Sequence, residues 1–352
     1  MSTSPRHSKK WADTAIVLMA SSLAINACTS HAQPPSATPP LATRAAHSLA
    51  GTAGTINAHT APASQGSTQQ PPQQCPAPLI KPAITNGVAC GPLNCRSFAQ
   101  APDAIAYLMR ETTPRVLAVG EIHAQKSNVL RVSPTQRFAT LLPIFCGNAR
   151  HIVIELMTGR NDCGDDRVEQ VRRAQEPVTL PQAAANQNDF FALGNVAKAN
   201  LIQPHALTPT CDEFKSILNA KDQDIARMLE LTATRSAEVA EGLLELNASA
   251  KGIPYVILYG GAMHNDMTPN VGREAFSYGP RLDAITQQRT TELDIVLREQ
   301  VKDTESFQRL AWYPEFRAPG LEQQFVLYQL GPKSFTLIYP AESQGQEAAT
   351  SR

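Results

Sequence analysis

The sequence contains little charge and no excess of either sign. Only 18% of its 352 residues are Asp, Glu, Lys or Arg, and 31 basic residues balance 31 acidic ones. Nucleic-acid-binding domains usually carry a basic excess, so this balance argues against a nucleic-acid partner. Aromatic residues are also scarce, at 6%, although hydrophobic residues as a whole reach 42%. A chain of this length and composition can still build a sizeable core.

Several common catalytic motifs are absent. There is no P-loop, and the pair Gly260-Gly261 is too short to be a dinucleotide-binding fingerprint. Ser277 has no Gly-x-Ser-x-Gly elbow around it, which argues against the usual serine hydrolase. No Cys-x-x-Cys pair occurs, so neither a zinc ribbon nor a thioredoxin motif is available.

The N-terminal segment has the pattern of an export signal. A basic stretch containing Lys9 and Lys10 precedes an apolar run at residues 14–27, which is shorter than the roughly 20 residues of a membrane span. Small and apolar residues before Cys28 resemble a bacterial lipobox, in which the cysteine is acylated and becomes the N-terminus. Ordinary cleavage after Ala32 is the alternative. We expect an exported lipoprotein, held in a bacterial envelope membrane by its lipid and facing the periplasm or the exterior.

A long segment after Cys28 lacks the residues that build a core. Between residues 29 and 80 the only charged residue is Arg44, and Ala, Pro, Ser, Thr, Gln and Gly dominate. Such a composition cannot offset the entropy of ordering the backbone. The expected parts are a signal peptide with a lipobox (1–28), a disordered tether (29–81), a folded domain (82–342) and a flexible tail (343–352).

The cysteines support an oxidising destination. Seven are present, and without Cys28 an even number remains. An even number in an exported chain predicts three disulfides, with the pairing left open. Cys90 and Cys95 are close enough in sequence to close a small loop, and Cys75 is placed to pin the end of the tether to the domain. The six candidates are Cys75, Cys90, Cys95, Cys146, Cys163 and Cys211.

Helical and strand patterns alternate through the folded part. The central strand patterns are continuous apolar runs, typical of strands that are covered on both faces. We predict one α/β domain whose mainly parallel sheet is flanked by helices and carries an antiparallel edge hairpin. The expected helices are 101–110, 134–145, 166–175, 181–199 and 213–249. The expected strands are 115–121, 151–156, a short one near 201–202, 253–259 and 293–297, and the hairpin joins 325–330 to 334–339.

Histidines and carboxylates follow the ends of these strands. Glu121 and His123 are two residues apart, so an extended backbone points both to one side. Glu155 ends the next apolar strand, and His264 follows a third strand and its glycines. Open α/β sheets bind ligands outside the carboxyl ends of their strands. The four side chains expected in one cleft are Glu121, His123, Glu155 and His264.

Two chemistries suit this set. The four side chains could bind a divalent metal that activates water. Alternatively, Glu121 and Glu155 would orient the histidines, with His123 as general base and His264 as second base or oxyanion partner. Asp266 and His205 form a second tier. Asp266 would orient His264 or cap the next turn, and His205 would line the same cleft or be structural.

The residues after the first strand resemble a known superfamily. Gly-Glu-Ile-His at 120–123 is similar to the Gly-Glu-x-His signature of haem-binding uptake (ChaN/Tiki-like) proteins, and erythromycin-esterase-like hydrolases carry a related Glu–His pair. Glu155 and the glycines before His264 match later motifs, and residues 221–226 are similar to an Arg-Asp-x-x-Met-Ala segment. The resemblance covers about residues 115–266. Uptake-type members continue with Asp-Asn and further histidines, which residues 124–128 lack.

The resemblance implies a Glu/His site in an α/β domain but leaves the reaction open. Members hydrolyse esters or amides, with or without a metal, or bind haem. We therefore expect a hydrolase-like lipoprotein that takes a small-molecule ester or amide. The first alternative is a haem- or iron-binding envelope protein without catalysis. The second is a non-catalytic interaction module on a stalk. A divalent metal or haem are the candidate cofactors.

The lipobox makes a direct prediction about the mature protein. We expect the chain in the membrane fraction to begin at an acylated Cys28, because small apolar residues precede that cysteine. Mass spectrometry of the N-terminal peptide measures this. A mature chain that begins at Gln33 without lipid would contradict the anchor and leave export intact.

Overall fold

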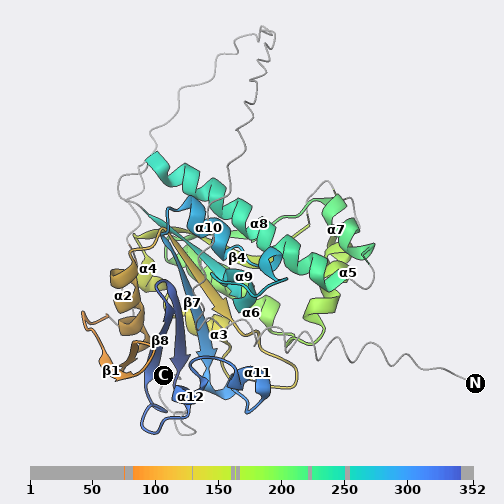
Figure 1. Ribbon diagram of the computed structural model, residues 1–352. Helices are drawn as coiled ribbons and strands as arrows, with labels where there is room; N and C mark the ends of the chain where they lie inside the picture. The colour runs from red at the N-terminus through yellow and green to blue at the C-terminus, as the bar shows by residue number, and fades with distance from the viewer. Residues whose placement is uncertain are drawn as a thin grey trace, which may run out of the picture. The chain divides into compact units, whose positions relative to one another are not determined.

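The apolar runs of the sequence form the strands of one mixed sheet (Figure 1). The structure, a computed structural model, describes Cys75 and residues 82–341 except 129, 160–162, 164–166, 221–223 and 250–253. The expected signal peptide with Cys28, the tether apart from Cys75, and the tail lie outside the described residues. The strands are β1 (Val88–Gly91), β2 (Cys95–Phe98), β3 (Val116–Glu121), β4 (Ala149–Met157), β5 (Gln203–Leu207), β6 (Tyr255–Gly261), β7 (Thr290–Leu297), β8 (Phe325–Gly331) and β9 (Ser334–Tyr339).

The sheet is mainly parallel with an antiparallel side. Its nine strands lie in the order β1-β2-β8-β9-β7-β3-β6-β4-β5. From β9 to β5 every neighbouring pair is parallel, and the pairs β1–β2, β2–β8 and β8–β9 are antiparallel. This confirms the predicted α/β class. The β8–β9 hairpin lies inside the antiparallel side, because the β1–β2 hairpin, which we did not predict, pairs with β8 and continues the sheet.

The central strands are covered on both faces by helices. All residues of β3, β6 and β7 are buried, which explains why their sequences are continuous apolar runs. The helices are α2 (Ala101–Thr112), α3 (Pro134–Ala139), α4 (Leu142–Phe145), α5 (Arg167–Thr179), α6 (Asn186–Ala199), α7 (Cys211–Leu218), α8 (Asp224–Leu246), α9 (Ala262–Asn265), α10 (Gly279–Ile285), α11 (Glu305–Gln308) and α12 (Tyr313–Phe316).

Alternate residues of each central strand pack into different layers. Leu117 and Val119 of β3 belong to a core cluster with α2, α3, α4 and α6. Val116 and Ala118 belong to a second cluster with α5, α7, α8 and α10. This alternation is the ordinary two-residue period of a strand. Figure 1 shows α8 running along one side of the sheet. Trp312, which is fully buried, anchors a smaller third cluster with α12, β2 and β8.

Two predicted helices are interrupted in the structure. The expected helix 134–145 is divided into α3 and α4, because Pro143 has no N–H to continue the hydrogen bonding of α3. The expected helix 213–249 is divided into α7 and α8. Before α7, Thr210 and Glu213 form a capping box that starts a separate helix. The strand expected near 201–202 is β5, which begins two residues later, at Gln203.

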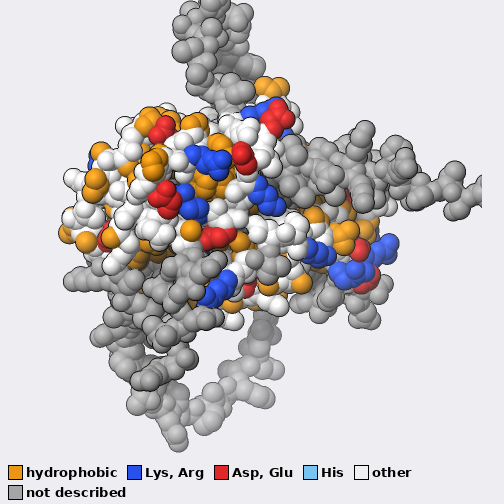
Figure 2. All heavy atoms as spheres, turned by 90° about the horizontal axis from the view of Figure 1, so that it is seen from below, with side chains coloured by type: hydrophobic (Ala, Val, Ile, Leu, Met, Phe, Trp, Pro, Cys, Tyr) orange, Lys and Arg blue, Asp and Glu red, His pale blue; other side chains and the backbone are white. Residues whose placement is uncertain are grey.

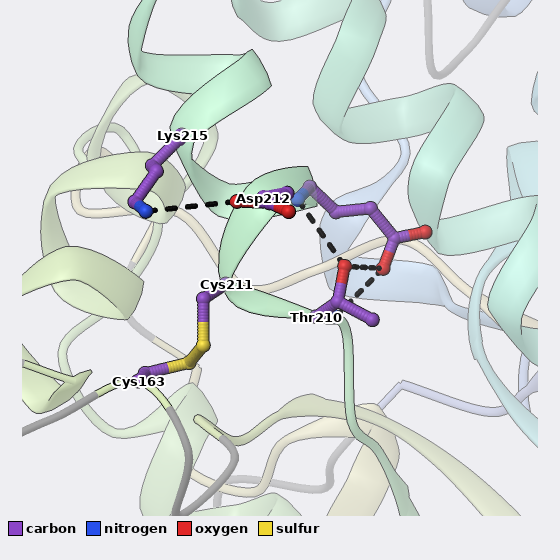
Figure 3. Close-up of a disulfide and its surroundings, with 6 residues drawn as sticks. Cys163, Thr210, Cys211, Asp212 and Lys215 are labelled. Atoms are coloured by element: carbon purple, nitrogen blue, oxygen red, sulfur yellow. Dashed lines mark hydrogen bonds and ion pairs between the residues drawn. A yellow bond between two sulfur atoms is a disulfide. The ribbon is translucent and has the colours of Figure 1, made fainter.

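All six candidate cysteines form disulfides. The pairs are Cys75–Cys146, Cys90–Cys95 and Cys163–Cys211. Figure 3 shows Cys163 joined to Cys211 at the start of α7, beside the Thr210 cap. Three disulfides indicate an oxidising, exported environment. No helix among the described residues is long and apolar enough to cross a membrane.

Charges of both signs are mixed on the surface. Figure 2 shows basic and acidic side chains interspersed on the face that it presents. Oppositely charged side chains also pair over short distances, as Arg281 does with Glu241 and Arg227 with Glu230. Such exposed pairs contribute about 1 kcal/mol or less each. The arrangement agrees with the balanced composition of the chain.

Opening the Cys75–Cys146 bridge should destabilise the domain more than opening Cys90–Cys95. The two bridges have sequence separations of 71 and 5, and the chain-entropy model gives about 4 and about 2 kcal/mol for such loops. We expect the double Cys→Ser change at 75 and 146 to lower the free energy of urea unfolding by about 2 kcal/mol more than the change at 90 and 95. Equal losses would contradict the loop argument.

Candidate functional site

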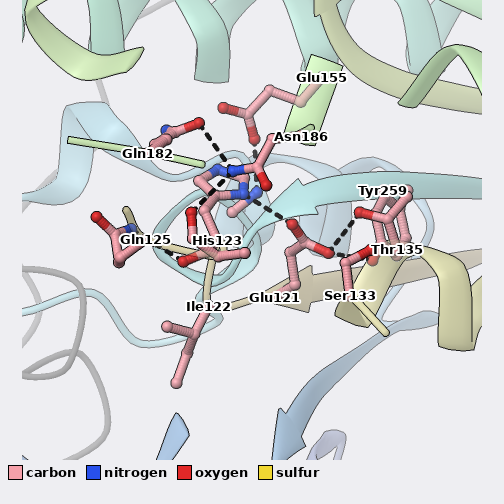
Figure 4. Close-up of polar contacts among 12 residues, drawn as sticks. Glu121, Ile122, His123, Gln125, Ser133, Thr135, Glu155, Gln182, Asn186 and Tyr259 are labelled. Atoms are coloured by element: carbon pink, nitrogen blue, oxygen red, sulfur yellow. Dashed lines mark hydrogen bonds and ion pairs between the residues drawn. The ribbon is translucent and has the colours of Figure 1, made fainter. Parts of the chain in front are cut away.

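Glu121, His123, Glu155 and His264 come together at the carboxyl edge of the parallel strands. Figure 4 shows Glu121, His123 and Glu155 there. Glu121 ends β3 and lies opposite Gly261 of β6 in the parallel register. The four side chains form two pairs. The Nδ1 atom of His123 lies 2.8 Å from Oε1 of Glu121, and Nε2 of His264 lies 3.5 Å from Oε1 of Glu155.

Glu121 is a buried carboxylate whose oxygens are all hydrogen bonded. It is 2% exposed. Thr135, in the first turn of α3, donates its hydroxyl to Oε2 at 2.8 Å, and the hydroxyl of Tyr259 from β6 donates to the same oxygen. Burial and the neighbouring Glu121 charge raise the pKa of Tyr259 well above its usual value, so Tyr259 stays protonated and remains a donor. These donors offset the cost of burying the charge.

His123 is held in one orientation by Glu121. Burial by itself would lower the pKa of His123, but the hydrogen bond and charge of Glu121, together with the charge of Glu155, outweigh it and raise that pKa above its usual value. Because Nδ1–H donates to Glu121, the neutral ring has its lone pair on Nε2. The amide of Gln125 donates to the backbone carbonyl of His123 at 2.9 Å and fixes the loop that carries it.

The second pair joins Glu155 to His264. The backbone N–H of Gly261 donates to Oε2 of Glu155 at 2.5 Å. Nδ1 of His264 lies 2.7 Å from the carbonyl oxygen of Phe276, and a carbonyl only accepts, so Nδ1 is protonated. A neutral ring therefore has its lone pair on Nε2, the atom that lies 3.5 Å from Oε1 of Glu155.

The two glycines that end β6 leave room for both pairs. A Cβ atom at Gly260 would lie 2.2 Å from Oε2 of Glu155, and one at Gly261 would lie 3.1 Å from Nε2 of His123. Any side chain at 260 would therefore displace Glu155. The same glycines are in the sequence as a short Gly-Gly pair, and their role here is to let a carboxylate and an imidazole approach one strand end.

A small cavity of about 50 Å³ opens onto His123 and Glu155. Its other walls come from β4, α5, α6 and α8, and include Gln182, Phe190 and Met228. Glu121 and His264 do not line it and lie behind the two residues that do. His123 and Glu155 are thus the groups that can reach a substrate, and each has one partner that orients it.

No metal site is found among the described residues, and the cavity is small for a haem. No three His, Cys, Asp or Glu side chains in the described part of the chain are grouped so that they could hold a metal ion. The four expected ligands are instead paired with one another. The cavity of about 50 Å³ is also far smaller than the roughly 300–1,000 Å³ of sites for larger ligands, so it does not accommodate a porphyrin.

The second-tier residues lie outside the site. Asp266 accepts a hydrogen bond from the backbone N–H of Thr268 at 2.8 Å and so caps the next turn rather than orienting His264. Of the two interpretations of His205, the structure agrees with the structural role. Its Nε2 lies 3.0 Å from Nδ1 of His151, because β5 runs parallel to β4 and places His205 opposite Val153, before the strand end.

A group of buried acids beside the site was not expected from the sequence. Glu292 and Asp294 of β7 are 2% and 3% exposed, and Asn265 donates to Oδ1 of Asp294 at 3.0 Å. Burial raises the pKa of Asp294 to about 7 and that of Asp266 to about 6. Burial, with the neighbouring acids, also raises the pKa of Glu292. The sequence feature that could have indicated these buried acids is the alternation Glu-Leu-Asp at 292–294 within an otherwise apolar strand.

Comparisons with known proteins give little further information. No family model matches the chain, and no curated protein matches it. A solved structure described as that of the type III effector HopBA1 covers 71% of this chain and 98% of its own, with 12% identity and a TM-score of 0.31. A likeness at that level carries no argument about fold or activity.

Replacing Asp294 with Asn should stabilise the domain at neutral pH. The pKa of Asp294 rises from 3.8 to about 7 in the folded state, so the unfolded chain ionises first as the pH rises. The folded state therefore loses stability between about pH 4 and pH 7. We expect Asp294→Asn to raise the free energy of unfolding at pH 7.5 by about 1 kcal/mol or more, with no gain at pH 4.

Urea unfolding at the two pH values measures this effect. Asp212→Asn is the matched control, since the Asp212 side chain is 94% exposed. The change in the free energy of unfolding caused by Asp212→Asn should be about the same at pH 4 and at pH 7.5. A variant at 294 that is less stable than the wild type at pH 7.5 would show that the ionised carboxylate is required.

Proposed function

We propose that this protein is a hydrolase that cleaves an ester or amide bond, with His123 and Glu155 at the reacting atoms. The supporting observation is that one cavity is lined by an imidazole and a carboxylate, each oriented by a residue behind it. A base and an acid at one small site are the two proton-transfer groups that hydrolysis needs.

The first step is attack by water. Nε2 of His123 accepts a proton from a water molecule in the cavity while the water oxygen forms a bond to the substrate carbonyl carbon. Glu121 stabilises the resulting imidazolium through the Nδ1–H hydrogen bond of 2.8 Å. Its charge also raises the pKa of His123, which makes the ring a stronger base.

The second step expels the leaving group. In this scheme a proton on the Glu155–His264 pair passes to the leaving oxygen or nitrogen as its bond to carbon breaks. The products are a carboxylic acid and an alcohol or amine. The proton on His123 then returns to the Glu155–His264 pair through water, so the site regains its starting charge. Glu121 and His264 are positioning residues in this scheme.

We further propose that the domain is carried by an envelope lipoprotein. The lipobox before Cys28 and the Ala- and Pro-rich segment that follows it support this arrangement. The disulfide between Cys75 and Cys146 would join the end of the tether to the domain. No observation favours the haem-binding or the interaction-module alternative over hydrolysis.

Activity on a panel of activated esters and anilides tests the hydrolase. We expect His123→Ala and Glu155→Gln to lower kcat/KM by about 100-fold or more, because general acid–base catalysis contributes about that much. His205→Ala is the matched control, since His205 is a partly buried histidine outside the site. Circular dichroism and thermal unfolding establish that each variant is folded.

The pH dependence of kcat/KM tests whether Glu121 positions His123 for catalysis or only supports the structure. Glu121→Gln removes the charge that raises the pKa of His123, so the rising limb of kcat/KM against pH should move to lower pH. A Glu121→Gln protein that is folded and keeps the wild-type profile would contradict the assigned role. Full activity in folded His123→Ala protein would refute the proposed hydrolase.

A further inference from the structure

We propose that the site accepts a small, uncharged acyl group of formyl or acetyl size, with the rest of the substrate left outside the cavity. This inference rests on the proposed hydrolysis and adds the substrate class. It is carried by the volume, the polarity and the packing of the cavity that His123 and Glu155 share.

The volume limits the acyl group. The cavity is about 50 Å³, far below the roughly 300–1,000 Å³ of pockets that hold drug-sized ligands. A space this small favours an acyl group of few atoms, such as acetyl, over a butyryl or octanoyl chain.

The polarity of the walls excludes a charged acyl group. Among the described residues, the charged or titratable groups that line the cavity are His123 and Glu155. The other polar residues of the described lining are neutral, namely Gln175, Thr179, Gln182, Asn186, Gln187 and Thr232. An anionic acyl group such as succinyl would be desolvated next to Glu155, and the described lining holds no Lys or Arg to compensate it, which is costly.

Packed apolar side chains keep the cavity from expanding. Phe190 of α6 is 6% exposed and contacts the ring of His123 edge-on, with centroids 5.9 Å apart. Met228 of α8 is 3% exposed and belongs to the core cluster on the other side of the sheet. Displacing either side chain would disturb a close-packed core. Met228 is the better position to trim, because Phe190 packs directly on the proposed base.

The test compares 4-nitrophenyl acetate, butyrate, octanoate and hemisuccinate on the full chain. We expect kcat/KM to fall by about tenfold or more from acetate to butyrate, to fall further for octanoate, and to be at least tenfold lower for hemisuccinate than for butyrate. In Met228→Ala the ratio of butyrate to acetate should rise by about tenfold. Leu243→Ala, a buried position of the same helix that does not line the cavity, should leave that ratio unchanged.

The outcomes separate this inference from the proposed function. Wild-type protein that cleaves octanoate as fast as acetate, and loses both activities in His123→Ala, would overturn the size limit and leave the hydrolase intact. Cleavage of hemisuccinate at the acetate rate would overturn the uncharged acyl group. If no ester or anilide is cleaved, the proposed function fails and the inference fails with it. The comparison of wild-type rates stands even if Met228→Ala does not fold.

Discussion

The buried carboxylate of Glu121 is the constraint around which the site is built. A charge at 2% exposure must be surrounded by donors, and these come from three separate parts of the chain. The three donors are Thr135 in the first turn of α3, Tyr259 in β6 and His123 in the loop after β3. Satisfying one carboxylate therefore fixes the relative positions of a helix, a neighbouring strand and the proposed base.

Glu155, the second carboxylate at the carboxyl edge of the sheet, has fewer polar partners than Glu121. Glu155 has a backbone N–H from Gly261 and the imidazole of His264 as its partners. Gly260 leaves the space that its carboxylate occupies. The two pairs thus meet across the end of β6, where the absence of side chains allows a base and an acid to share one cavity.

A different balance holds for the acids of β7. Glu292 and Asp294 are as buried as Glu121, but burial raises the pKa of Asp294 to about 7 rather than leaving it a fully compensated anion. The fold tolerates this cost beside Gly120, where a Cβ atom would lie 2.5 Å from Oδ1 of Asp294. Gly120, the first residue of the Gly-Glu-Ile-His motif, therefore leaves space for a side chain of the neighbouring strand β7.

The sequence by itself determined the α/β class, the apolar central strands, the even set of disulfide-forming cysteines and the four polar residues at strand ends. Each of these follows from local pattern, because burial on both faces of a sheet selects continuous apolar runs and parallel strands share one carboxyl edge. Tertiary structure alone decided that Glu155 pairs with His264, that His205 contacts His151, and that Glu292 and Asp294 are buried together. Those outcomes depend on strand order, register and the space left by Gly260 and Gly261, which are set by contacts between segments far apart in the chain.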